Sequence, residues 1–194
     1  MNPKKEAILR VVLDYLIGNH HEKLTIANIA KVLDIGKSTV YEYFTEKNTM
    51  IAEAIFLMIE ENVAYLCEIE NFDELSFETA FKTHMQRSYD IAKNNRMMEN
   101  MLYNIDFVSI SVSHKAAIQN KIMAAYIDIQ QHVRKIFDKG IAERLFDAST
   151  KKIREITIES MLLGSVFTIT HPDRNIDEAL FIEDLYQSVL VLLK

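Results

Sequence analysis

The segment from Thr25 to Lys47 constrains the fold more than any other part of the chain. It contains two apolar-periodic stretches, each too short to form a stable isolated helix, and a tight turn at residues 34–36 separates them. This arrangement is typical of a helix-turn-helix, in which a first helix supports a second one that enters the major groove of DNA. The spacing predicts the second helix from about Gly36 to Tyr43.

The predicted second helix has one apolar and one polar face. Val40 and Phe44, four residues apart, should turn inward and hold it on its support. The polar face carries a cation, hydroxyls and phenols, which can contact phosphates and base edges. It comprises Lys37, Ser38, Thr39, Tyr41, Glu42 and Tyr43. Thr25 should cap the first helix, where its hydroxyl and the free N–H groups beside it could also meet a phosphate.

The same residues resemble the TetR family of bacterial transcriptional repressors. That family has an aliphatic-Ala pair in the supporting helix, then a Gly-Val-Ser-x-x-Thr-aliphatic-Tyr run, then x-aromatic-Phe-x-x-Lys. Here the matching positions are Ile29-Ala30, Ile35 to Tyr41, Tyr43-Phe44 and Lys47. The match covers roughly the first quarter of the chain, and several non-apolar positions agree at fixed spacing.

Two positions depart from the family pattern. Asp34 stands where the family usually has the turn glycine, and Gly36 stands where it usually has a capping Ser or Thr. Aspartate tolerates the left-handed backbone conformation better than most residues, and glycine is an acceptable N-cap. We therefore expect the turn to form in spite of both changes.

The resemblance implies DNA contacts at Thr39, Tyr41 and Lys47, with Lys37, Ser38 and Tyr43 at neighbouring positions. Core packing is the alternative for Tyr41. For Lys47 the alternative is a solvated residue at a helix N-terminus. A cation is electrostatically unfavourable there, so a nearby phosphate would account for it better.

Composition favours an all-α fold. Only four Gly and two Pro occur in 194 residues, so helix breakers are few. We expect a three-helix DNA-binding head over residues 1–46 and a larger helical body over 47–194. The predicted helices are residues 3–18, a short helix capped by Thr25, residues 36–43, a helix from residue 45 or 47 to 67, and residues 76–95, 96–106, 113–139 (closed by Gly140), 149–170 and 177–193. Residues 107–113 alternate apolar and Ser, which is a strand signal, but no partner strand exists and we expect a loop.

The charge is unevenly distributed. The net charge is −6, but residues 1–50 hold seven Lys or Arg against six Asp or Glu, and residues 51–194 hold fifteen against twenty-two. The acidity therefore lies in the body. A nearly neutral head gives little long-range attraction to DNA, so two heads acting together are expected.

The predicted helix at 149–170 is apolar on nearly all sides and the helix at 177–193 is rich in Leu, so one chain offers too few remaining elements to bury both fully. Pairing with their symmetry mates in a two-fold, four-helix interface would bury them, and the resemblance implies the same pairing. The alternative is that both helices are simply core. The expected homodimer contacts are Ser160, Gly164, Phe167, Leu185 and Val189.

The middle of the chain is rich in Met and aromatic residues. At helical spacing such residues more often form core than pocket. The resemblance nevertheless implies a cavity here for a small, mostly apolar effector with a few polar handles. The candidate ligand-binding residues are His84, Tyr89, Met101, Tyr103, Phe107 and Tyr126.

Other functions find little support in the sequence. No nucleophile elbow, P-loop or dinucleotide fingerprint is present, so we expect neither an enzyme nor a bound cofactor. His20-His21-Glu22 lies in a turn without an evident third metal ligand, and the single Cys67 excludes an internal disulfide. The apolar runs are too short for a membrane span and no leader is evident, so we expect a cytoplasmic protein.

These observations together predict a ligand-responsive regulator of transcription. Its homodimer should bind double-stranded DNA at a near-palindromic operator as a repressor, and a small effector should release it. The alternative is a helical interaction protein that kept the fold and binds a protein partner instead of an operator.

Overall fold

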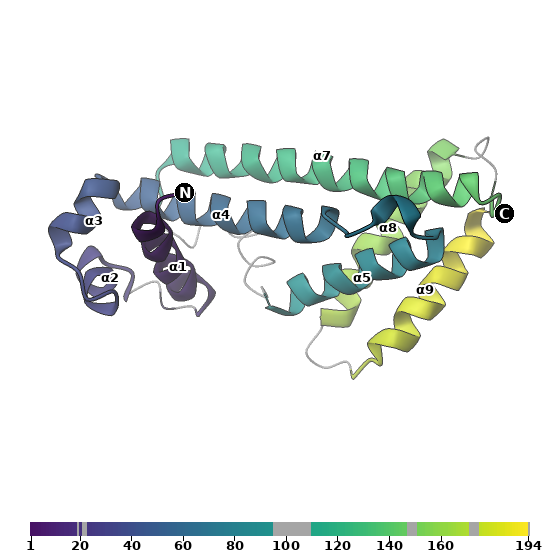
Figure 1. Ribbon diagram of the computed structural model, residues 1–194, viewed down its shortest axis with the longest axis horizontal. Coiled ribbons are helices and arrows are strands. Elements are labelled where there is room, and N and C mark those ends of the chain that lie inside the picture. Colours follow the sequence, from purple (N-terminus) through teal and green to yellow (C-terminus); the bar gives the residue numbers. More distant parts are fainter. Residues whose placement is uncertain (19, 21–22, 95–109, 147–150, 171–174, 194) are drawn as a thin grey trace. The chain divides into compact units, whose positions relative to one another are not determined.

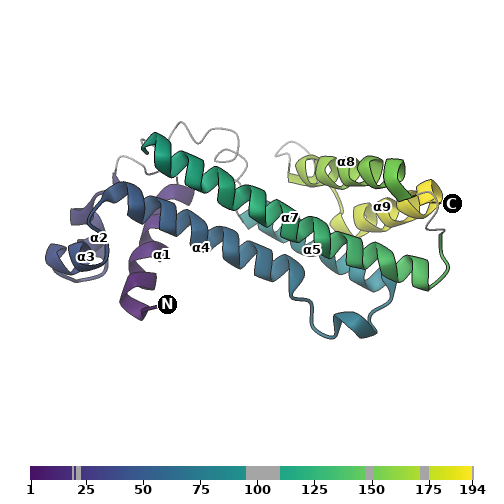
Figure 2. The ribbon, with the colours of Figure 1, turned by 90° about the horizontal axis from the view of Figure 1, so that it is seen from above.

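The computed structural model describes residues 1–18, 20, 23–94, 110–146, 151–170 and 175–193. Every regular element within these ranges is a helix (Figures 1 and 2), which confirms the all-α fold class. The helices pack into two compact units. Unit 1 comprises residues 1–62 and the described part of 95–126, and unit 2 comprises residues 63–94 and the described part of 127–194.

Capping residues determine where the first two helices begin. Helix α1 spans Pro3–Ile17, and the side chain of Asn2 accepts a hydrogen bond from a backbone N–H of its first turn. Proline at the first helical position loses no hydrogen bond, because that N–H has no partner within a helix. Helix α2 spans Ile26–Val32, and Thr25 caps it through its hydroxyl, as predicted.

The turn after α2 has the predicted backbone conformation. Asp34 has a φ of 53°, in the left-handed region that this position requires. The N–H of Ile35 donates to the carbonyl of Ala30 at 3.0 Å and closes the turn. Helix α3 then spans Lys37–Tyr43, with Gly36 as its N-cap in extended backbone. Both departures from the family pattern are therefore accommodated.

Two long helices contribute to both units. Helix α4 spans Lys47–Cys67 and helix α7 spans Val112–Ala142. Within unit 1 their first parts lie side by side (Figures 1 and 2), and Lys121 of α7 pairs with Glu60 of α4 at 2.5 Å. The predicted loop before α7 is described only at residues 110–111, which have no regular structure. The predicted helix at 96–106 and the break at 171–173 lie outside the described residues.

Unit 1 has its own apolar core, and ion pairs tie α1 to α4. Arg10 donates through both terminal nitrogens to the carboxylate of Glu61, and Lys5 pairs with Glu53 at 2.5 Å. These pairs are partly exposed, so each contributes at most about 1 kcal/mol. The core supplies the larger share. It includes Ile8, Leu9, Val12, Leu16, Leu24, Ile29, Val40, Phe44, Met50, Ile51, Ala54, Ile55 and Ile118.

Unit 2 is built on α5, which packs against α8 and α9. A 3₁₀ turn at Phe72–Glu74 precedes α5, which spans Phe77–Asn94. Helix α8 spans Lys151–Thr170 and α9 spans Glu178–Leu193. The described core of this unit is strongly aromatic. It includes Phe77, Phe81, Met85, Tyr89, Ile136, Phe146, Ile158, Leu162, Ile182, Leu185, Tyr186, Val189 and Leu193.

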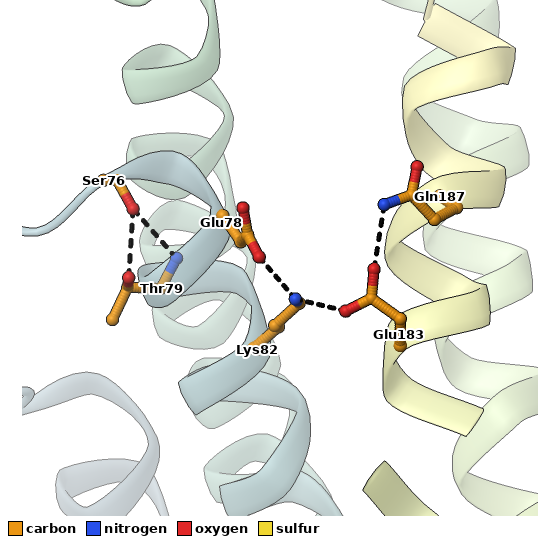
Figure 3. A network of polar contacts seen from close by, with 6 residues as sticks. All are labelled: Ser76, Glu78, Thr79, Lys82, Glu183 and Gln187. Carbon is orange, nitrogen blue, oxygen red and sulfur yellow. Dashed lines mark hydrogen bonds and ion pairs between the residues drawn. The ribbon is translucent and has the colours of Figure 1, made fainter. Parts of the chain in front are cut away.

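A polar network on the surface of unit 2 joins α5 to α9 (Figure 3). Lys82 pairs with Glu78 one turn away and with Glu183 on α9, which in turn accepts from Gln187 at 2.8 Å. The Lys82 ammonium also lies 4.9 Å from the ring centre of Tyr186. The ammonium of Lys82 lowers the pKa of the Glu183 carboxyl from its usual value. The network fixes α9 against α5 at the surface, above the aromatic core.

The predicted end of α7 at Gly140 is wrong, because the helix continues to Ala142. Gly140 is buried, and a Cβ atom at this position would lie 2.3 Å from Cζ of Phe146 and 3.2 Å from Cδ2 of Phe77. The glycine therefore makes room for two aromatic rings and does not terminate the helix.

Gly140→Ala should destabilise the protein by about 1–3 kcal/mol, because the added methyl group forces the Phe146 ring out of its place. Chemical unfolding at fixed protein concentration measures the effect. Gln119→Ala, at an exposed position of the same helix, is the control. Helix propensity alone should make that control neutral or slightly stabilising. Equal stability of both variants would contradict the packing role of Gly140.

Candidate nucleic-acid interface and effector site

Helix α3 presents the predicted polar face to solvent. Tyr41 is 54% exposed, so the alternative of core packing is wrong for this side chain. Lys37 and Ser38 are also exposed, whereas Val40 and Phe44 are fully buried in unit 1. The arrangement leaves a phenol, a hydroxyl and a cation free to reach a DNA groove while two apolar anchors hold the helix.

Tyr43 has a supporting contact that sequence reasoning missed. Its hydroxyl donates to Oδ1 of Asn2 at 3.3 Å, and the same oxygen caps α1 by accepting from Lys4 N–H. One amide side chain therefore joins the start of α1 to the end of α3. No local pattern predicts this pairing, because the two residues lie 41 positions apart.

The start of α4 has one exposed cation and one contact to α7. Lys47 is the first residue of the helix and is exposed, which is compatible with its predicted contact to a phosphate. Two residues on, the hydroxyl of Thr49 lies 3.2 Å from Nε2 of His114, and Nδ1 of that ring lies 2.6 Å from the hydroxyl of Ser111. His114 thus links the first turn of α4 to the start of α7 within unit 1. Thr25 and Thr39, the remaining predicted contacts, are exposed and partly buried, respectively.

The candidate effector residues are buried, exposed or outside the described residues. Tyr89 and His84 are buried in unit 2. The hydroxyl of Tyr89 donates to Ser165 at 3.2 Å, so the protein itself satisfies that group. Tyr126 is 40% exposed on α7. Met101, Tyr103 and Phe107 lie outside the described residues.

His84 has a partner that the sequence did not single out. The ring of His132 on α7 lies 5.4 Å from the ring of His84 on α5, at 40° between planes, and each residue is 6% exposed. Phe72 packs on His132 at 5.1 Å between ring centres. Among the described residues, neither Nδ1 of His84 nor Nε2 of His132 has a hydrogen-bond partner. An unpaired buried polar group costs about 1–3 kcal/mol, so this pair calls for an explanation.

Both rings are neutral at neutral pH. Burial, then the nearby His132 and Arg87, lowers the pKa of His84 to about 4. Burial and the positive charges of Lys135 and Arg87 likewise lower the pKa of His132 to about 4. Neutral imidazoles can donate from one nitrogen and accept at the other.

The histidine pair predicts a loss of stability in acid. In the unfolded chain a histidine binds a proton below about pH 6.5, whereas buried His84 resists protonation down to about pH 4. Unfolding therefore takes up a proton in this window, and stability falls as the pH drops from 6.5 towards 4. His84→Gln should reduce this slope by up to about 1.4 kcal/mol per pH unit. Urea unfolding at a series of pH values measures the slope, with His20→Gln at an exposed position as control. An unchanged slope would mean that His84 titrates normally.

The described residues offer no evident metal site. Within them, no three His, Cys, Asp or Glu side chains gather to hold an ion, and His21 and Glu22 lie outside the described ranges. Cys67 is half-buried, and burial raises the pKa of its thiol. None of the described helices is long and apolar enough to span a membrane.

The predicted dimer residues separate into exposed and buried groups. Ser160 and Gly164 are exposed on α8, whereas Leu185 and Val189 on α9 are buried within the core of unit 2. The side chain of Phe167 lies outside the described set. The same two helices expose apolar side chains outside the predicted set. These are Leu163 (52%), Leu180 (69%), Val191 (73%) and Leu192 (41%).

Solved structures with this architecture come from several bacteria. A protein described as a TetR-family transcriptional regulator from Vibrio parahaemolyticus superposes with a TM-score of 0.69 at 13% identity, over 98% of each chain. The fatty acid degradation regulator FadR from Bacillus halodurans gives 0.67 at 13% identity, over 98% of this chain and 96% of its own. A TetR-family regulator from Streptomyces coelicolor gives 0.64 at 16% identity, over 99% and 81%.

No protein-family model and no curated protein matches the sequence, so the likeness rests on structure. The three proteins are described as regulators of transcription or of fatty acid degradation. The similarity extends over nearly the whole chain, whereas the sequence resemblance covered about its first quarter. The chain therefore has the fold of TetR-family transcriptional regulators, as the residues of its helix-turn-helix predicted.

Proposed function

We propose that the protein is a homodimeric transcriptional repressor that binds a near-palindromic operator and is released by a small, mostly apolar effector. Residues 1–46 would bind DNA, and residues 47–194 would bind the effector and dimerise. The observation that carries the proposal is the arrangement of α3: Lys37, Ser38, Tyr41 and Glu42 are exposed, while Val40 and Phe44 anchor the helix. A protein with this role works where the DNA is, in the cytoplasm.

The uneven charge supports the pairing of two DNA-binding heads in a dimer. Residues 1–50 carry a net charge of only +1, from seven Lys or Arg against six Asp or Glu. Since phosphate neutralisation supplies much of the affinity for DNA, one such head would bind weakly. Two heads held by a dimer would double the set of contacts. The separation of the two heads would then set the operator spacing, at one helical turn or a multiple of it.

Effector release requires that the ligand bind the free protein better than the DNA-bound protein. Helix α4 is suited to couple effector binding to DNA binding, because it starts at Lys47, shortly after α3 in the sequence, and ends at Cys67 in unit 2. The Thr49–His114 contact would extend the same coupling to α7.

A protein-binding role is the competing function. The acidic residues 51–194, with fifteen Lys or Arg against twenty-two Asp or Glu, favour a basic partner over a nucleic acid. Binding to duplex DNA that is sequence-selective and weakened by salt separates the two functions. The upstream DNA of the gene that encodes the protein is the natural first target for footprinting.

Tyr41→Ala and Lys47→Ala should each weaken operator binding and leave the protein folded, because both side chains are exposed. Lys47→Ala should act about equally on all DNA sequences and lower the salt slope by roughly one unit, as loss of a phosphate contact does. Tyr126→Ala and Arg134→Ala, exposed on α7, are the matched controls. Fluorescence anisotropy at several salt concentrations measures both quantities. Unchanged binding in both head variants would remove α3 and α4 from the DNA interface.

Dimerisation through α8 and α9 predicts a second set of variants. Gly164→Leu and Val191→Glu both alter exposed positions, so the chain should fold while the dimer dissociates at least tenfold more readily. Met123→Glu places the same charge at an exposed apolar position of α7 and serves as control. Sedimentation velocity should give monomers for the first two variants and a dimer for the third. Dimers of normal stability in all three would move the interface to another surface.

A further inference from the structure

The two buried histidines of unit 2 point to the chemistry of the effector. His84 comes from α5 and His132 from α7, and their rings lie 5.4 Å apart in an apolar setting beside Phe72. Each residue is 6% exposed, and each has one ring nitrogen with no partner among the described residues. Buried polar atoms in native proteins nearly always have a partner, so a polar atom from outside the chain is expected here.

The tautomers of the two rings decide what their unpartnered nitrogens need. A neutral imidazole carries one proton, on either ring nitrogen. With its proton on Nε2, His84 offers a lone pair at the unpartnered Nδ1 and needs a donor there. With its proton on Nε2, His132 can act as a donor at its own unpartnered nitrogen. In these tautomers the pair presents one acceptor and one donor.

The charges around the rings narrow the choice of occupant. The positive charges of Arg87 and Lys135 act on the two rings, and they disfavour an ammonium group or a metal cation. A metal would also need a third donor, and the described residues gather no such set. A carboxylate has only acceptors, so it could pair with Nδ1 of His84 only if that nitrogen carried a proton, and burying the carboxylate charge in an apolar setting costs further free energy.

An uncharged hydroxyl meets both requirements at once. We propose that the effector is an alcohol or phenol whose hydroxyl donates to Nδ1 of His84 and accepts from Nε2–H of His132. The inference rests on the proposed effector-binding role of residues 47–194 and specifies the polar handle of that ligand. The fully buried Tyr89 does not compete for this role, because its hydroxyl is already bonded to Ser165.

Two matched series of compounds test the proposal on the full-length protein. The first is 4-ethylphenol with ethylbenzene and 4-ethylbenzoate, and the second is 1-octanol with octane, octanoate and octylamine. Calorimetry or thermal shift gives the affinities, and long-range ¹H–¹⁵N spectra of the histidine rings report the two nitrogens directly. We expect a hydroxyl compound of at least one series to bind about tenfold more tightly than its hydrocarbon, and to shift the Nδ1 resonance of His84.

Variants assign the effect to the two rings. His84→Phe and His132→Phe should each abolish the tenfold preference for the hydroxyl over the hydrocarbon, whereas His20→Phe, at an exposed position of unit 1, should keep it. Should a phenylalanine variant fail to fold, the ring-nitrogen shifts of the unaltered protein still decide the question.

Several outcomes would overturn the inference. They are the absence of any binder in both series, tighter binding of the carboxylates with proton uptake, and ring shifts produced by Zn²⁺ alone. Operator binding, measured on the same preparation, separates this failure from that of the proposed function. A protein that binds operator but no hydroxyl compound contradicts the effector chemistry alone. A protein that binds a hydroxyl compound but no DNA contradicts the proposed regulatory function and leaves the proposed histidine site standing.

Discussion

The burial of Val40 and Phe44 in the core of unit 1 is the interaction on which the candidate DNA interface depends. Helix α3 has only seven residues, too few to be stable in water without tertiary support. Its orientation is therefore set by these two anchors, by the turn at Asp34 and by the hydrogen bond from Tyr43 to Asn2. The exposed residues of α3 can be polar because they contribute little to its stability. The candidate DNA-contacting residues of α3 and the residues that stabilise it therefore lie on opposite faces of the helix.

Local patterns predicted the elements of unit 1 closely. The caps at Thr25 and Gly36 and the left-handed Asp34 are visible in the sequence because each depends on one residue type at one backbone position. The predicted end of α7 was wrong for a physical reason. A glycine near the end of a helical pattern can terminate the helix, or it can make room for a neighbouring ring. The sequence looks the same in both cases, and only the position of Phe146 shows that the second applies at Gly140.

The parts of the candidate sites that depend on contacts between residues far apart in the sequence could not be predicted. His84 was chosen as a polar residue in an apolar region, but nothing in the sequence marked His132, which lies 48 positions away, as its neighbour. Leu185 and Val189 fit the apolar pattern of an interface equally well as that of a core, and the structure places them in the core. The spacing of apolar residues predicted the helices, but only the packing shows which apolar residues of each helix are covered within the chain. Tyr41 shows the opposite case, because a phenol on α3 could have packed inward and is 54% exposed instead.

The bond from Tyr43 to Asn2 couples the start of one helix to the end of another. Oδ1 of Asn2 accepts both from the N–H of Lys4 and from the hydroxyl of Tyr43. A single amide oxygen therefore caps α1 and contacts the last turn of α3. Loss of that oxygen would act on two helices at once, so fraying of α1 and a change in the orientation of α3 would be linked events and not independent ones.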